Sequence, residues 1–129
     1  MLLVNYFVSG VVTSPNHPAP YPNHLKKTHT IEVESDKKLR LVFTHFDLRF
    51  GYGLLGCGGT QGPCDYVKIT DGDGTTLMSL RRPTGTITTR SHRVEIFFRT
   101  DSDPKGLQQI RTGWSLSWSA VTPGVKALF

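Results

Sequence analysis

The fold of this chain is decided by residues 39–48, which read Leu39-Arg40-Leu41-Val42-Phe43-Thr44-His45-Phe46-Asp47-Leu48. Leu39, Leu41 and Phe43 recur at every second position, the period of a strand that packs one face on a core. A second strand is predicted over residues 65–70. The loop between the two strands, residues 49–64, holds six glycines and the only two cysteines. Because loops on a rigid scaffold carry much of protein function, we expect a functional site at this edge.

Other segments also show strand patterns separated by turn signals. Residues 28–34, 75–80, 86–89 and 93–99 are predicted strands, and a closing strand has Trp114, Leu116 and Trp118 facing inward between serines. Residues 14–23 contain four prolines, which block both a helix and a central strand and predict an extended loop. With no convincing helix, the pattern predicts an all-β antiparallel sandwich or jelly roll.

The Asp-Gly steps at residues 71–74 fit either a hairpin turn or a calcium-binding loop. The spacing of an EF-hand, with its distal glutamate, is missing here. The sequence therefore favours a plain turn.

The chain has 129 residues, the size of one domain. We predict a single domain over residues 1–121, followed by a tail or linker over residues 122–129, since Thr122-Pro123-Gly124 ends the last strand pattern. No apolar run approaches the ~20 residues of a membrane-spanning helix. The composition thus predicts a globular domain without membrane insertion.

Fifteen Lys and Arg against ten Asp and Glu give a formal net charge of +5. The basic residues occur as scattered pairs: Lys26-Lys27, Lys37-Lys38 and Arg81-Arg82. Two interpretations remain open: a solvated basic surface, or a dedicated site for an acidic glycan or another polyanion. Nothing in the pattern indicates a nucleic-acid-binding helix.

Catalytic motifs are missing from the sequence. None of the five histidines has metal-ligand spacing on a recognisable helix. There is also no nucleophile elbow, glycine-rich phosphate loop or framed acidic pair. The prediction is a protein without enzymatic activity, in which His45 is a structural or surface histidine.

Five motifs together resemble the CUB domain, an extracellular β-sandwich module of complement proteases, tolloid-type proteases, neuropilins and spermadhesins. They are SPNHP with YPN at residues 14–23, LVFTHFDL at 41–48, CDYVKI with DG at 64–72, IFFRTD at 96–101 and GWSL at 113–116. The resemblance covers residues 10–120 and is greatest with amino-terminal CUB domains of complement-type proteases. It implies a β-sandwich of CUB type and a secreted, non-catalytic module for protein–protein interaction.

Many CUB domains hold calcium with a Tyr, a Glu directly after the Phe-Asp-Leu motif, and two Asp. The matching positions here are Tyr21, Arg49, Asp65 and Asp101, so an arginine stands where the glutamate is expected. Arg49 could bond both carboxylates in place of the metal, which predicts a degenerate site without a cofactor. Alternatively, the loop shifts the register and Arg49 points to solvent. Calcium binding then stays open, with Asp103 as a compensating ligand.

The cysteines also depart from the family pattern. The usual second pair joins the strand after the long loop to a later Cys-Gly, but residues 80–85 contain no cysteine. Cys57 and Cys64 are left to pair with each other or to stay free. Two nearby cysteines in a secreted-looking sandwich favour the disulfide, which would contribute about 2–2.5 kcal/mol.

The resemblance leaves three functional hypotheses. The first is a protein-binding module that uses its loop edge, where Phe50, Tyr52, Leu54 and Leu55 either form a partner-binding patch or fold back on the sandwich. The second is a glycan- or heparin-binding domain similar to a spermadhesin, which uses the basic surface. The third is a structural spacer without a ligand.

Overall fold

The computed structural model describes residues 8–48, 65–79, 83, 85–101 and 111–122. These residues form no helix, and therefore none that could cross a membrane. They form eight strands: β1 (Ser9–Thr13), β2 (Lys26–Glu32), β3 (Lys38–Asp47), β4 (Tyr66–Asp71), β5 (Thr76–Met78), β6 (Ile87–Thr88), β7 (Arg93–Arg99) and β8 (Gly113–Val121).

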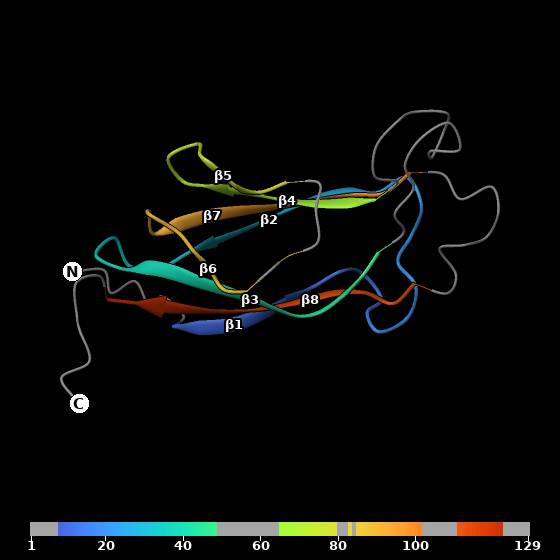
Figure 1. Ribbon diagram of the computed structural model, residues 1–129, viewed down its shortest axis with the longest axis horizontal. Helices are drawn as coiled ribbons and strands as arrows, with labels where there is room; N and C mark the ends of the chain where they lie inside the picture. Colours follow the sequence, from blue (N-terminus) through green and yellow to red (C-terminus); the bar gives the residue numbers. More distant parts are fainter. Residues whose placement is uncertain (1–7, 49–64, 80–82, 84, 102–110, 123–129) are drawn as a thin grey trace, which may run out of the picture.

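The strands build two stacked sheets of four, with the orders β1-β8-β3-β6 and β2-β7-β4-β5 (Figure 1). Every strand pairing is antiparallel. The predicted antiparallel β-sandwich is confirmed. The segment between β1 and β2 runs along one end of the sandwich and carries the chain from one sheet to the other (Figure 1).

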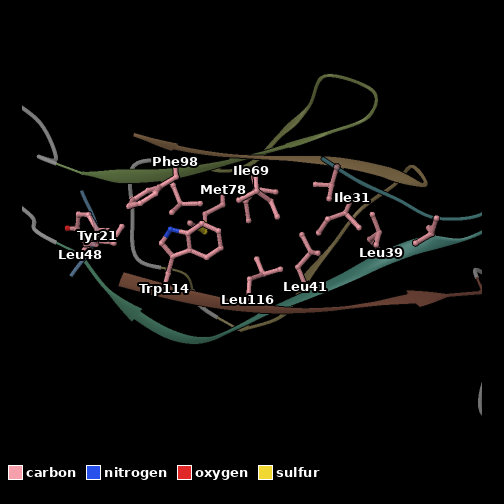
Figure 2. Packing of buried hydrophobic residues seen from close by; sticks show 14 residues of the cluster. Tyr21, Ile31, Leu39, Leu41, Leu48, Ile69, Met78, Phe98, Trp114 and Leu116 are labelled. Carbon is pink, nitrogen blue, oxygen red and sulfur yellow. The ribbon is translucent and has the colours of Figure 1, made fainter. Parts of the chain in front are cut away.

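The core fills the space between the sheets (Figure 2). It forms because the inward residues of β3, β4, β7 and β8 are apolar at every second position. Fourteen hydrophobic residues are buried in one cluster: Tyr21, Ile31, Val33, Leu39, Leu41, Leu48, Val67, Ile69, Met78, Val94, Ile96, Phe98, Trp114 and Leu116. Tyr21 and Leu48 lie at one end of this core and Leu39 lies towards the other (Figure 2).

The two tryptophans of β8 face the core, as predicted, but they are buried to different degrees. Trp114 is fully buried and meets the ring of Phe98 edge to face, with centroids 5.8 Å apart. Trp118 is only partly buried and lies over Gly10 of β1, where an added Cβ would come within 2.8 Å of the indole. Glycine is therefore required where β1 crosses this ring.

Most strand boundaries differ from the predicted ones by one or two residues. The strand predicted at 28–34 begins earlier, at Lys26, and the strand predicted at 86–89 is reduced to Ile87–Thr88. In β3 the register shifts between Phe43 and His45, so that His45 lies opposite Ser115 on β8. The bulge at Thr44 ends the simple alternation that the sequence showed.

The segment between β1 and β2 is not extended throughout, which corrects the prediction for residues 14–23. Residues 15–18 turn, because the His17 amide donates to the Ser14 carbonyl at 3.2 Å and the Ala19 amide donates to the Asn16 carbonyl at 2.6 Å. Asn16 adopts a positive φ of 66°, which asparagine tolerates better than most residues. The sequence excluded regular structure here, but the proline count did not reveal the turn.

The hairpin at residues 71–74 is a turn, as predicted. Its buried carboxylate, Asp71, accepts backbone hydrogen bonds from Gly72 at 2.7 Å, Arg90 at 2.6 Å and Ser91 at 3.2 Å. These amides use the oxygens that a calcium loop would direct at a metal. Asp71 therefore fastens the β4–β5 hairpin to the chain before β7.

Candidate functional site at the loop edge

The loop edge is the end of the sandwich where the β1–β2 segment, the start of β4, the end of β7 and residues 111–112 meet. Its position follows from the register, in which Tyr66 of β4 lies opposite Arg99 of β7. In an antiparallel pair, the residue before one strand and the residues after its partner come to the same end. Asp65 and Asp101 are thereby brought together, although 36 positions separate them.

Asp65 is the centre of this arrangement and is fully buried. Its Oδ2 accepts the hydroxyl hydrogen of Tyr21 at 2.5 Å, and its Oδ1 accepts the amide hydrogen of Asp101 at 3.0 Å. A buried carboxylate needs such donors, because an unpaired charge away from water is very costly. The Tyr21 ring packs edge to face against Phe98, with centroids 5.2 Å apart, which fixes the hydroxyl over Asp65.

Thr100 holds the β1–β2 segment against the end of β7. Its hydroxyl accepts the Leu25 amide at 2.8 Å and donates to the Pro22 carbonyl at 2.8 Å, while its own amide donates to the Leu25 carbonyl at 2.9 Å. Tyr21 comes directly before this clamp in the sequence. The clamp therefore positions the tyrosine for its bond to Asp65.

Three of the four predicted site residues thus meet at the loop edge: Tyr21, Asp65 and Asp101. Arg49 lies outside the described residues, and so do Cys57, Cys64 and the aromatic and leucine residues of the long loop. The placement of Arg49 beside Asp65 and Asp101 stays a prediction, and so does the disulfide.

A second polar network at the loop edge was not recognised in the sequence. The Asp47 carboxylate accepts hydrogen bonds from Arg111 Nη1 at 3.1 Å, from the Thr112 amide at 3.0 Å and from the Thr112 hydroxyl at 3.1 Å. His45 Nε2 lies 2.5 Å from the same hydroxyl, and His17 Nδ1 lies 2.7 Å from the Thr112 carbonyl oxygen. Asp47 is 64 positions from Arg111, and no local pattern links the two.

The network determines which nitrogen of His17 and of His45 donates a hydrogen bond. Since the Thr112 hydroxyl donates to Asp47, His45 Nε2 must donate to the hydroxyl oxygen; His17 Nδ1 must likewise donate to a carbonyl. Both rings thus hold residue 112 in place, and His45, whose bond is exposed, fits the structural or surface role predicted for it.

Partial burial raises the pKa of the Asp47 carboxyl, but hydrogen bonds from the Thr112 amide, from Arg111 and from the Thr112 hydroxyl outweigh it and lower the pKa. A lowered pKa in the folded state stabilises the fold above the pKa of the unfolded chain, and this contribution is lost as the pH falls below it.

We therefore expect Asp47→Asn to lower the free energy of unfolding by about 1–2 kcal/mol at pH 7, since the side chain is 30% exposed and solvent weakens its bonds. The difference from wild type should shrink towards pH 3, as measured by urea denaturation at both pH values. Asp36→Asn, at an exposed turn, is the control and should change little. A loss that stays constant down to pH 3 would show that the charge of Asp47 is not its cause.

The described residues do not by themselves make a calcium site. Among them, no group of three or more His, Cys, Asp or Glu side chains is arranged to hold a metal ion. Calcium takes six to eight oxygen ligands. Asp65 already directs both of its oxygens at Tyr21 and Asp101. The other candidate positions, Arg49 and Asp103, lie outside the described residues.

Comparison with known proteins identifies the family. The family model for the CUB domain matches residues 7–118, which is most of the chain. The chain belongs to the CUB family. The predicted resemblance is thereby confirmed, and it extends over both sheets of this CUB domain.

Relatives of this CUB domain occur as parts of much longer proteins. It is 31% identical over 115 residues to mannan-binding lectin serine protease 1 of Rattus norvegicus and 33% identical over 115 residues to the Homo sapiens protein. It is also 33% identical over 121 residues to cubilin of Canis lupus familiaris. The matches cover 87–90% of this chain but only 15% of the proteases and 3% of cubilin.

Solved structures of CUB domains also superpose on this chain. The CUB2 domain of MASP-1, whose crystal structure is bound to Ca²⁺, superposes with a TM-score of 0.68 at 29% identity, over 88% of this chain and 94% of that one. The CUB1-EGF-CUB2 structure of human MASP-1/3 gives 0.69 at 24% identity, over 90% of this chain and 42% of that one, which supports the fold alone. One structural neighbour of this CUB domain therefore holds calcium.

Proposed function

We propose that this CUB domain is a non-catalytic, extracellular binding module that receives a protein partner at its loop edge. The observation that carries the proposal is the fully buried Asp65 carboxylate, held by Tyr21 and the Asp101 amide at the end of the sandwich. Its relatives support an extracellular setting, since they are parts of mannan-binding lectin serine protease 1 and cubilin. In this proposal residues 1–121 form the module and residues 122–129 form a tail or linker.

The second part of the proposal is that Arg49 replaces the calcium ion. A site with three carboxylates and one divalent ion has a net charge of −1. Asp65 and Asp101 with one arginine also have a net charge of −1, without any ion. A planar guanidinium can bond two carboxylates at once, and its positive charge repels calcium.

The consequence concerns how a partner is recognised. In the calcium-dependent mode implied by the family resemblance, acidic residues at the ordered loop edge receive a lysine or arginine of the partner. Here Arg49 would already neutralise those residues. Binding of the partner would then move to the long loop that follows Arg49 in the sequence, or to the basic surface.

Calorimetric titration with calcium of the 129-residue protein tests the replacement directly. We expect no binding by wild type, whereas Arg49→Glu should bind one calcium with a Kd of about 0.1–1 mM, the range of extracellular modules. Adding Asp65→Asn to that variant should abolish the gain.

The matched control is Arg40→Glu, which makes the same charge change at an exposed position of β3. This strand belongs to the sheet opposite the one that contains β4 and β7. This variant should not bind calcium. Equal calcium affinities for wild type and Arg49→Glu would show that Arg49 is not in the site, and the partner-binding edge would then be calcium-organised.

A further inference from the structure

The outer face of the β2-β7-β4 sheet gathers three cations around two aromatic rings. We call this surface the basic-aromatic patch; it consists of Lys26, Tyr66, Lys68, Phe97 and Arg99. In the register, Lys26 and Tyr66 both lie opposite Arg99, and Lys68 lies opposite Phe97. The intervening residues of β4 and β7 are buried, so the patch residues of these two strands share the outward face. Lys26 shares this face because it lies directly opposite Arg99.

The positive charges of the patch are not compensated within the described residues. None of Lys26, Lys68 and Arg99 forms an ion pair with a described carboxylate. The nearest outward carboxylate on β7, Glu95, is already paired with Arg93 Nη2 at 3.3 Å. All three cations are exposed to solvent. An anionic ligand would therefore meet charges that no described carboxylate of the domain neutralises.

The like charges of the patch destabilise the sheet that carries them. Lys26 and Arg99 are directly opposite each other, and like charges at such positions are destabilising. Lys68 is a diagonal neighbour of Arg99, at about 7–8 Å between backbones. Natural proteins keep such unfavourable groupings where a function needs them.

The aromatic rings supply a partly apolar floor between the charges. Tyr66 and Phe97 are half-buried, with ring centroids 6.2 Å apart and planes tilted by 59°. Such rings offer a face to an apolar surface, and the tyrosine adds a hydroxyl for hydrogen bonding. Neighbouring strands lie about 4.8 Å apart, so the cations from β2 to β4 span about 10 Å.

We propose that the basic-aromatic patch binds a sulfated polysaccharide. Closely spaced sulfates fit the three cations, and sugar rings can lie on the aromatic floor. A peptide could not add as a strand beside β7 or β4, because each of them is already paired on both sides. The patch also has no exposed apolar side chain that could anchor it in a membrane. The large hydrophobic residues that are exposed in the described part of the chain lie outside these strands; they are Val8, Val11 and Val42.

The test is the affinity of the 129-residue protein for size-defined heparin, measured by calorimetry over a range of salt concentrations. Wild type should bind at about 0.15 M salt, with an affinity that falls steeply as salt is added. The variant Lys26→Thr/Lys68→Thr/Arg99→Thr should flatten the plot of log affinity against log salt by about three units, about one for each ionic contact. It should melt no lower than wild type, because opposed like charges are removed.

The matched control is Lys38→Thr/Arg40→Thr/Arg90→Thr, which removes the same charge from β3 and from the chain before β7. It should keep a slope close to that of wild type. If the triple patch variant does not fold, Lys68→Thr alone should flatten the slope by about one unit.

Four outcomes would overturn the proposal. The first is that wild type does not bind heparin at about 0.15 M salt, and the second is that the control loses as much affinity as the patch variant. The third is that polyglutamate competes with heparin for the protein as strongly as unlabelled heparin does, and the fourth is that oligo(dT) competes as strongly. The second would indicate a general charge effect, the third an acidic peptide and the fourth a single-stranded nucleic acid.

Discussion

Trp114→Ala should lower the free energy of unfolding by about 3–5 kcal/mol, the largest loss that we expect from one core substitution. Trp114 is fully buried, and three rings surround it edge to face: Phe98 at 5.8 Å, Phe43 at 6.0 Å and His29 at 6.4 Å between centroids. Removing the indole leaves a cavity between the sheets that these rings cannot fill without leaving their positions. Urea denaturation followed by far-ultraviolet circular dichroism measures the loss.

Trp118→Ala is the matched control, because it makes the same change on the same strand and the same face. Trp118 is only partly buried, so we expect less than half of the cost. An equal or larger cost for Trp118→Ala would contradict the placement of the core centre at Trp114.

Asp65→Ala should cost about 2–4 kcal/mol, since it removes the acceptor of two hydrogen bonds at a buried position. The donors of these bonds are the Tyr21 hydroxyl and the Asp101 amide. Tyr21→Phe removes only one side of one hydrogen bond and should cost less, about 1–2 kcal/mol.

The double variant Tyr21→Phe/Asp65→Ala closes a thermodynamic cycle. We expect the costs to be non-additive by at least about 0.5 kcal/mol, because either change alone already breaks the bond that the two side chains share. Additive costs would show that the hydroxyl–carboxylate bond does not hold the loop edge together.

The strands could be predicted because one face of each is buried and the side-chain period is two. Residues 93–99 illustrate this, since the predicted strand and β7 coincide. Their partners could not be predicted: Asp47 and Thr112, like Asp65 and Asp101, meet only through the order of strands in the sheets. The family resemblance, and no local pattern, grouped Tyr21 with the two aspartates.

The charged surface shows the same limit of local patterns. Lys26-Lys27 reads as a basic pair in the sequence, but consecutive residues of a strand point to opposite faces. The cation beside Lys26 on its own face is Arg99, from another strand. Cross-strand register thus forms the patch, which adjacent letters cannot reveal.

The most direct test of the proposed loop edge is the melting temperature of wild type in millimolar calcium and again in EDTA. A ligand that binds only the folded state must raise the melting temperature by mass action. If Arg49 takes the place of the ion, the two temperatures should agree within about 1 °C, since a stabilisation of only 1 kcal/mol would already move a domain of this size by several degrees. A calcium-dependent rise of several degrees would contradict the account, because the loop edge would then hold calcium despite Arg49.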